Sequence, residues 1–263
     1  MAEPDTPQSP FAGMADISVR TSSSHAFSRR DRADAAEHRL YLETEYHQGH
    51  RANFSSADLT GRDFSGLNLR GIKMDRAVLT GADFTGAHLQ SANPVGALAE
   101  QACFDRADLS RARLSGADLV SSSLEDACLA KAEMEFALAA NPVLRGACLR
   151  EADMSGTQLD AAVLIGADLR KANLRGAGFR HARGDAADLR YARLGGEFLV
   201  ATSLRGADLR GAYFRLAKLD GADLSDADLG GVEGLTQGQL NRAHRNSGTK
   251  LPMGLIGMEN AER

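Results

Sequence analysis

The side chains best suited to catalysis are scattered along this chain of 263 residues. Seven histidines could serve as general bases, but five of them lie outside the repetitive central part of the sequence. None stands at a spacing typical of a nucleophile elbow, a phosphate loop or a zinc-binding pair. We therefore expect each histidine to be a solvated polar residue, and we predict no enzyme, no cofactor and no metal site. The seven are His25, His38, His47, His50, His88, His181 and His244.

Two sets of charged side chains recur every 20 residues and could form a binding face. One set is acidic and the other basic, and three of the arginines close an Ala-Asp-Leu-Arg unit. Like charges that stack closely repel, so we expect the two sets to lie side by side and neutralise each other, with little contribution from each pair. The alternative is a flat charged face that docks onto a partner. The sets are Asp168, Asp188, Asp208 and Asp228, with Arg150, Arg170, Arg190 and Arg210.

Composition and charge narrow the class of protein. Apolar residues make up 43% of the chain, yet there is no Trp and only 5% is aromatic, a bias that favours a small repeated unit over an ordinary mixed core. The net charge of −4 is too mild for a nucleic-acid binder or a strongly acidic mimic. No run of 18 apolar residues predicts a membrane span, and residues 1–10 do not resemble a signal peptide. We expect a cytoplasmic protein; a secreted effector remains open.

A large apolar residue recurs at every fifth position between Phe54 and Leu229. Of the 36 positions in this frame, 32 are Leu, Phe or Met, and the frame never slips. We call these 36 positions the centres of the five-residue units. Ala stands two residues before 28 of the centres, and Asp or Asn is the commonest residue just before them. Gly stands two residues after 16 of them. On an α-helix five residues advance about 500°, so no apolar stripe would form. In an extended segment, Ala and the following Leu face the same side, and a bend must then restore the register.

The pattern Ala-(Asp/Asn)-Leu-x-Gly resembles the pentapeptide-repeat family over residues 52–231. The resemblance implies an all-β fold, a right-handed quadrilateral β-helix in which four units make one coil. Nine coils at the usual β spacing of ~4.8 Å would give a rod about 43 Å long. The exceptions among the centres should be weak points, and large residues at the Ala position should mark coil ends or distortions. The former are Pro94, Ala99, Ala139 and Gly184, and the latter Arg62, Leu67, Ile72 and Glu197.

Both ends of the solenoid carry sequences that predict short capping helices. Ser28 to Asp31 resembles a capping box, and so does Thr236 to Gln239, after which Ser247-Gly248 should end the helix. Such plugs would protect the terminal coils from end-to-end pairing. The expected organisation is a disordered tail at 1–27, a helical cap at 28–51, the solenoid at 52–231, and a helical cap and tail at 232–263.

Stacking of the coils places further residues in columns. Cys128 and Cys148 are 20 residues apart and would lie within reach of a disulfide, while Cys103 has no such neighbour. We expect Cys128 and Cys148 to serve only as small side chains of the column in a reducing compartment. A redox switch, in which the two form a disulfide, is the alternative. An outward apolar column could be a contact strip or dimer seam, or simply scattered surface residues. It contains Val78, Leu98, Leu138 and Phe198.

Two classes of function compete for such a rod. The first is a passive rod that binds or scaffolds an unknown protein partner, with no nucleic acid, no membrane and a homodimer as an option. The second is a DNA-mimicking binder of topoisomerase (gyrase), similar to the quinolone-resistance members of the family. The repeat region has 24 acidic and 21 basic residues, too balanced for a polyanion mimic. We therefore predict the generic protein binder.

Overall fold

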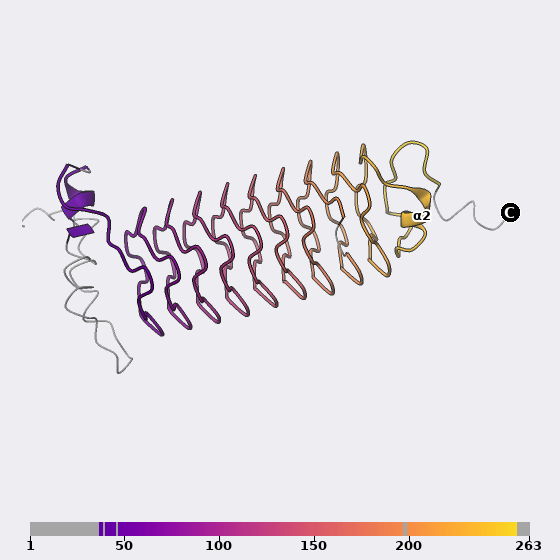
Figure 1. Cartoon of the computed structure of the whole chain (residues 1–263). Helices are drawn as coiled ribbons and strands as arrows, with labels where there is room; N and C mark the ends of the chain where they lie inside the picture. Colours follow the sequence, from indigo (N-terminus) through magenta and orange to yellow (C-terminus); the bar gives the residue numbers. More distant parts are fainter. Residues whose placement is uncertain (1–36, 39, 46, 197–198, 257–263) are drawn as a thin grey trace, which may run out of the picture.

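The chain winds into a stack of similar coils that runs from residue 53 to the C-terminal cap (Figure 1). The computed structural model describes residues 37–38, 40–45, 47–196 and 199–256. Within the solenoid, single parallel bridges join residues 20 positions apart, so each coil contains four five-residue units, as the family resemblance implies. The first coil pairs Asn53 with Lys73, Asp58 with Val78, Asp63 with Asp83 and Asn68 with His88.

Four ladders of bridges define four faces of the stack. We call the faces 1 to 4 after the ladders that begin at Asn53, Asp58, Asp63 and Asn68. Each ladder continues in steps of 20 residues along the stack. Successive faces are joined by a corner, the residue two positions after each centre. This frame fixes the place of every side chain in the repeat region.

The interior is a continuous apolar column. All 36 centres are buried, and so is almost every residue two positions before them; Ala57 is partly exposed and Glu197 lies outside the described residues. On face 3, the rings of Phe64, Phe84 and Phe104 stack with centroids 4.9 and 5.0 Å apart and planes within 7° of parallel. Because coils repeat at nearly this distance, identical side chains meet the same neighbours above and below.

The preference for Asp or Asn before the centre has a hydrogen-bonding cause. The N–H of the residue after the centre takes no part in the ladders, and the side chain before the centre accepts from it. Asp63 accepts from the N–H of Ser65 at 2.9 Å, and Asp83 from that of Thr85 at 2.8 Å. The coil geometry leaves the N–H after the centre pointing outward, and the Asp or Asn side chain accepts a hydrogen bond from it.

Every corner has left-handed backbone. The N–H after the corner donates to the carbonyl of the centre, as from Arg62 to Leu59 at 3.1 Å, and the corner residue has a positive φ, the combination of a type II turn. Glycine adopts this conformation freely and explains its place in the motif. Twenty of the 36 corners are not glycine, however, and residues as large as Tyr191 (φ 61°) and Leu216 (φ 67°) adopt it. The ladders on both sides impose the turn on these residues.

Replacing a corner alanine by glycine should therefore stabilise the rod. Ala161 has a φ of 57°. The left-handed conformation costs an L-residue roughly 1–2 kcal/mol, and the extra chain entropy of glycine returns part of this. We expect Ala161→Gly to raise the free energy of unfolding in urea by about 0.5–1 kcal/mol. The neighbouring buried Ala162 is the control, since Ala162→Gly should destabilise; a loss of stability in both variants would contradict the argument.

The breaks in the repeat have local effects. Pro94 has no N–H, and the bridge between Asn93 and Arg113 is missing from an otherwise regular ladder on face 1. At Gly184 the absent side chain is largely replaced by Leu204, whose Cδ2 atom lies 3.0 Å from where a Cβ would stand. The frame of the coil survives both breaks.

The C-terminal cap begins as predicted but is not mainly helical. Helix α2 spans Gln237–Leu240, and Thr236 and Gln239 form the expected capping box. The prediction that the helix ends at Ser247-Gly248 was wrong, because α2 is a single turn (Figure 1). The chain then returns as extended backbone, and the carbonyls of His244 and Lys250 each accept at 2.8 Å from the last coil, from Leu224 and Leu229. A longer helix could not satisfy these donors.

The N-terminal cap is described from residue 37. Residues 37–38 and 40–43 are helical, and Leu42 is buried against the first coil. The proposed capping box at Ser28 to Asp31 lies outside the described residues. No helix in the described ranges is long and apolar enough to cross a membrane.

His38 corrects the expectation that all histidines are solvated. It is fully buried, its Nδ1 atom accepts from the N–H of Ala52 at 3.2 Å, and its ring stacks on Tyr41. Burial, with smaller contributions from Arg51 and His50, lowers its pKa from 6.5 to about 4. The neutral imidazole thus links the N-terminal cap to the first coil.

Acid should loosen this cap. Between pH 6.5 and about 4 the unfolded or released cap binds a proton that the docked cap does not, so stability falls as pH falls through this window. We expect hydrogen exchange at the Ala52 amide, corrected for its intrinsic pH dependence, to accelerate over this range. His38→Asn keeps an acceptor and cannot titrate, so its exchange should be insensitive to pH. An identical pH response in that variant would assign the effect to another group.

Candidate interaction face

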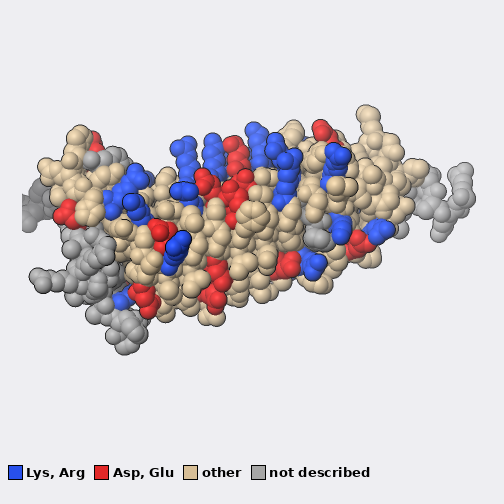
Figure 2. Space-filling model, viewed as in Figure 1, with Lys and Arg blue, Asp and Glu red and all other residues tan. Residues whose placement is uncertain are grey.

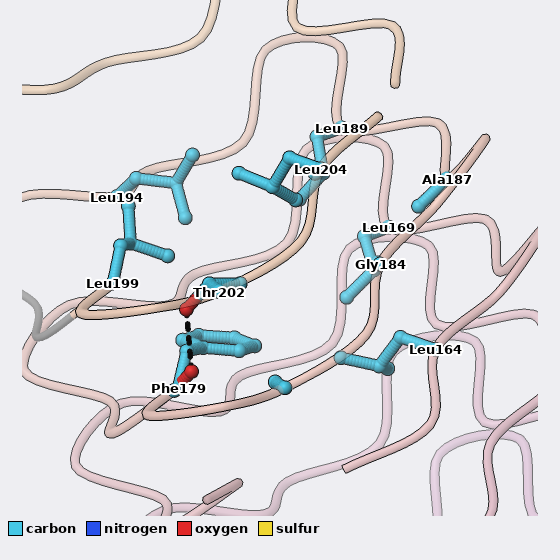
Figure 3. Close-up of a pocket in the computed structure, with 11 residues that line it drawn as sticks. Leu164, Leu169, Phe179, Gly184, Ala187, Leu189, Leu194, Leu199, Thr202 and Leu204 are labelled. Carbon is cyan, nitrogen blue, oxygen red and sulfur yellow. Dashed lines mark hydrogen bonds between the residues drawn. The ribbon is translucent and has the colours of Figure 1, made fainter. Parts of the chain in front are cut away.

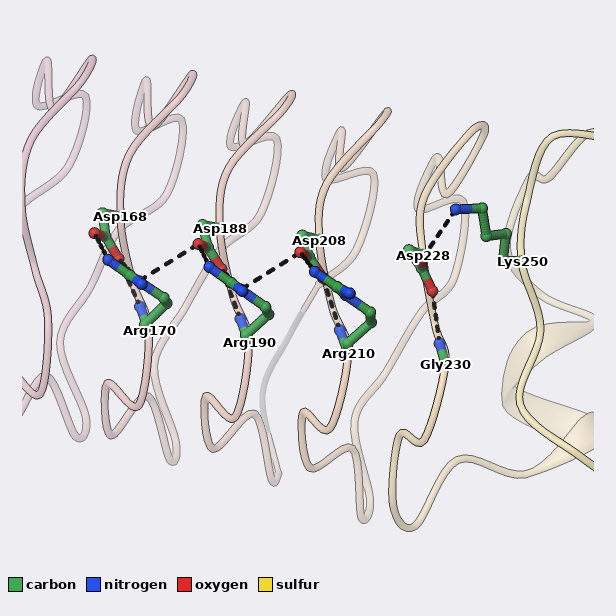
Figure 4. Close-up of polar contacts among 9 residues, drawn as sticks. All are labelled: Asp168, Arg170, Asp188, Arg190, Asp208, Arg210, Asp228, Gly230 and Lys250. Carbon is green, nitrogen blue, oxygen red and sulfur yellow. Dashed lines mark hydrogen bonds and ion pairs between the residues drawn. The ribbon is translucent and has the colours of Figure 1, made fainter.

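Face 4 brings the predicted acidic and basic columns together (Figure 4). Each Asp stands just before a centre, and the Arg two residues later turns back onto it in the same coil. Arg190 donates from Nε to Oδ1 of Asp188 at 2.9 Å and from Nη2 to Oδ2 at 2.6 Å. Arg170 with Asp168 and Arg210 with Asp208 repeat this two-pronged pairing. The columns neutralise each other, as the spacing predicts.

The same side chains also link neighbouring coils. Nε of Arg170 lies 3.4 Å from Oδ2 of Asp188, and Nε of Arg190 lies 3.4 Å from Oδ2 of Asp208. Arg150 contacts Asp168 and extends the chain of charges at one end. We call this set of residues, from Arg150 to Arg210, the charge ladder.

Two aspartates of this column, Asp208 and Asp228, have a lowered pKa. Hydrogen bonds from Arg210 hold the pKa of Asp208 below its usual value, against the opposing effect of burial. At the end of the column, burial raises the pKa of Asp228, but hydrogen bonds from Gly230 and Lys250 lower it by more. Lys250 Nζ lies 3.1 Å from Asp228 and closes the acidic column. Each aspartate from Asp168 to Asp228 in this column therefore has a basic partner.

The stacked cysteines lie on the same face, towards the N-terminus. Cys128 and Cys148 are bridge partners in adjacent coils, and both are free thiols, as is Cys103 on face 3. Burial, together with the neighbouring Cys148 and Asp108, raises the pKa of the Cys128 thiol. A protonated thiol is a poor nucleophile, which disfavours rapid oxidation. The expectation was two small side chains without a disulfide, and the redox switch stays the untested alternative.

The predicted apolar strip is short and interrupted. Val78, Leu98 and Leu138 share the ladder of face 2, with Asp118 between the last two, and Phe198 lies outside the described residues. Leu98 and Leu138 are 48% and 41% exposed. They are too few to form a continuous seam.

Two exposed aromatic residues at corners were not anticipated from the sequence. Phe136 is 72% exposed and its ring covers Gly156, where a Cβ would lie 2.6 Å from a ring carbon. Tyr191 covers Gly211 in the same way. The available signal was an aromatic corner followed by glycine 20 residues later.

Buried apolar side chains occupy the interior along the described part of the rod. The cavity beside Gly184 has a volume of about 10 Å³, lined by apolar groups except Thr202, whose hydroxyl donates to the carbonyl of Phe179 (Figure 3). A hollow of about 370 Å³ lies between the last coil and the cap, where Arg242 pairs with Asp220 at 2.9 Å. Among the described residues, no group of three or more side chains could hold a metal ion.

Charge is segregated around the rod rather than balanced everywhere. Counting the outward positions and corners of residues 53–231, face 4 has eight basic and six acidic residues, and the adjoining face 1 has six and four. Face 2 has two basic and five acidic residues, and face 3 four and eight. Figure 2 shows basic side chains along one edge of the rod, with acidic ones between and below them. The near-zero total hides this asymmetry.

Comparison with known proteins agrees with the repeat. The family described as pentapeptide repeats matches in eight copies, over residues 50–93, 102–137, 143–176, 162–196 and 199–232. No curated protein matches the chain.

Several solved structures match the chain, and among them HetL and an Arabidopsis protein are described as pentapeptide-repeat proteins. HetL of the cyanobacterium Nostoc sp. strain PCC 7120, involved in heterocyst differentiation regulation, is 28% identical; the match covers 83% of this chain and 97% of HetL, with a TM-score of 0.48. A protein of the Arabidopsis thaliana thylakoid lumen is 28% identical over 40% of this chain and 66% of its own, with a TM-score of 0.30. A variant of QnrB1, a plasmid-mediated fluoroquinolone resistance protein, is 22% identical over 70% and 91%, with a TM-score of 0.32.

Proposed function

The chain belongs to the pentapeptide-repeat family, and from this premise we propose that it is a non-catalytic rod that binds another protein through its outer faces. The observation that supports this most is the filled interior: the apolar column leaves about 10 Å³ of space beside Gly184, so ligands can meet only the outer surface. We further propose a right-handed coil of quadrilateral section, with capped ends, working in the cytoplasm. A homodimer is compatible with this function.

We propose the charge ladder of face 4 as the main docking surface. Its side chains are held in place on both sides by pairing within and between coils, so a partner would not have to order them on binding. A flat row of alternating charges suits a protein surface with the complementary pattern, and such complementarity favours specificity. The exposed Leu98, Phe136 and Leu138 supply apolar contacts on another side of the rod.

The experiment is affinity capture from the native cell, followed by binding measurements with the purified partner. Asp188→Ala combined with Arg190→Ala removes one rung of the charge ladder without changing net charge. Glu125→Ala combined with Arg145→Ala removes an ion pair of face 3 in the same way. We expect only the first variant to weaken binding. Failure of the wild type to retain any protein at physiological salt would refute the proposed function.

DNA mimicry is the second candidate, and one observation favours it. Faces 2 and 3 adjoin each other and together have 13 acidic and six basic residues. This side is more acidic than the total charge suggests, although Arg145 and Arg205 pair with acidic residues within it. A DNA-binding groove would therefore meet a mixed surface rather than the continuous negative one of a polyanion.

A supercoiling assay with purified gyrase tests this candidate. We expect neither inhibition of the enzyme nor protection from quinolones at low micromolar concentrations of the rod, because opposite charges cancel much of the field. A variant that changes Arg106, Arg145, Arg183 and Arg205 to Glu removes every basic residue of face 3 and serves as the comparison. Inhibition by the wild type that weakens steeply with salt would establish the mimic instead.

A further inference from the structure

Three arginines on face 1 differ from those of the charge ladder in having no acidic partner. Arg175, Arg193 and Arg215 come from three successive coils and are all exposed. None of them forms an ion pair with another of the described residues. Lys171, at the corner between faces 4 and 1, is likewise exposed and outside any such pair. We call these four residues the basic patch.

The backbone beneath the basic patch offers further donors. In many units of the rod, the Asp or Asn before a centre accepts from the N–H after it, as Asp153 accepts from Ser155 at 3.0 Å. In the units centred on Leu194 and Phe214, that place is taken by Arg193 and Tyr213, which have no acceptor suited to this turn. Among the described residues, no acceptor meets the N–H groups of Gly195 and Arg215.

Hydrogen bonds elsewhere in the rod show which group can accept from these N–H donors. Where a side chain in the rod accepts from such an N–H, it is a carboxylate in most cases, as with Asp153, Asp188 and Asp208. The carboxylate can also come from an adjacent coil, as when Asp160 accepts from the N–H of Arg180 at 2.9 Å. Gly195 has no side chain, and in the register of the coils it lies between Arg175 and Arg215. A carboxylate from outside could take the vacant position and meet the arginines as well.

Acidic residues limit the length of the basic patch. Glu133, Glu135 and Asp153 precede it on face 1, and Glu233, the bridge partner of Tyr213, follows it. Three coils at ~4.8 Å spacing extend only about 10–15 Å. A long polyanion would run over carboxylates at both ends, whereas a short cluster of acidic side chains would not.

We propose that the basic patch binds a short carboxylate-rich segment of a protein, with its carboxylates paired to Arg175, Arg193 and Arg215 and one of them accepting from the N–H of Gly195. That the segment belongs to the rod's physiological partner rests on the proposed function. The recognition chemistry is independent of which face provides the rest of the interface.

The test uses the full chain and a fluorescent peptide in which three glutamates alternate with serines, read by anisotropy. A peptide with glutamines in place of the glutamates and a 12-residue oligothymidylate are the comparison probes. The variant with Arg175, Arg193 and Arg215 changed to Gln should bind the glutamate peptide about ten-fold more weakly, as three lost ion pairs would suggest. The control changes Arg106, Arg145 and Arg183 to Gln, the same loss of charge on face 3, and should stay within about two-fold.

A second pair of variants isolates the backbone donor. Arg193→Gln and Arg193→Asn remove the same charge, but only Asn stands at the right length to accept the N–H of Gly195, as Asn53 accepts that of Ser55 at 3.0 Å. We expect Arg193→Asn to bind the glutamate peptide about three-fold more weakly than Arg193→Gln. This difference corresponds to part of the binding free energy of one hydrogen bond. Equal affinities would remove the N–H donor from the proposal.

Three outcomes would overturn the inference as a whole. The first is equal weakening by the face 1 and face 3 triple variants, which would indicate non-specific attraction. The second is oligothymidylate binding that is as tight as peptide binding and depends on the same arginines, which would assign the patch to nucleic acid. The third is a captured partner that binds the face 1 variant as tightly as the wild type; the protein-binding function would then stand without this patch. If the rod binds the peptide but captures no partner, the basic patch would stand and the proposed protein-binding function would fail.

Discussion

Replacing Leu169 by Asp should lower the free energy of unfolding by about 3–5 kcal/mol, because it buries a charge without a partner. Leu169 is a centre of face 4 and is 1% exposed. The carbonyls and N–H groups around it are already paired in the ladders. Its own N–H, for example, donates to the backbone carbonyl of Asp188 at 2.8 Å. Urea denaturation followed by circular dichroism in the β region measures the effect.

The neighbouring Arg170 is the matched control. It belongs to the charge ladder, and its side chain is 32% exposed. Surface ion pairs contribute little even when their geometry is good, so Arg170→Gln should change stability by less than about 1 kcal/mol. Similar losses at the two positions would contradict the assignment of inward and outward residues on which the description of the faces depends.

The second large effect is expected at the stacked phenylalanines of face 3. Phe84 is fully buried between Phe64 and Phe104, at centroid distances of 4.9 and 5.0 Å. Phe84→Ala removes the middle ring and leaves a cavity between two rings that are fixed to their own coils, so we expect a loss of about 3–5 kcal/mol. The measurement is again the urea transition.

Phe84→Leu shows whether the ring itself matters. Leucine occupies the same column in later coils, at Leu124, Leu144 and Leu164, so the backbone accepts it without change. We expect this variant to lose only about 1–1.5 kcal/mol. If the leucine variant were as unstable as the alanine variant, the stabilisation would come from contacts between the rings rather than from filling the column.

The repeat could be predicted from the sequence because its signal is periodic. A strict five-residue frame excludes helices and assigns every side chain to the inside or the outside. The 20-residue spacing, which the structure confirms, also brings Arg190 beside Asp208 and Cys128 beside Cys148. These are consequences of register alone.

Features without a period were harder to predict. The cap helix was expected to reach Ser247-Gly248, but the last coil needs extended partners, which His244 and Lys250 provide. The burial of His38 depends on how the N-terminal cap sits on the first coil, and no spacing encodes that.

The basic patch was missed for a different reason. The total charge of the chain does not indicate the patch, because basic and acidic residues are divided unevenly among the four faces. The signal was present in the repeat itself, where Arg193 and Tyr213 replace the usual Asp or Asn before a centre. Departures from a repeat at outward positions are therefore where specific function should be sought in such a rod.

The isolated bridges between residues 20 positions apart also determine how the rod would respond to force. The hydrogen bonds of every ladder point along the long axis, for instance from Leu189 to the carbonyl of Asp208 at 2.8 Å. A pull on the two ends would thus load one coil's bonds at a time rather than shear many together. Each coil that peels away would release 20 residues, about 66–72 Å of extended chain. The molecule would therefore unfold from one end, coil by coil, in steps of equal length.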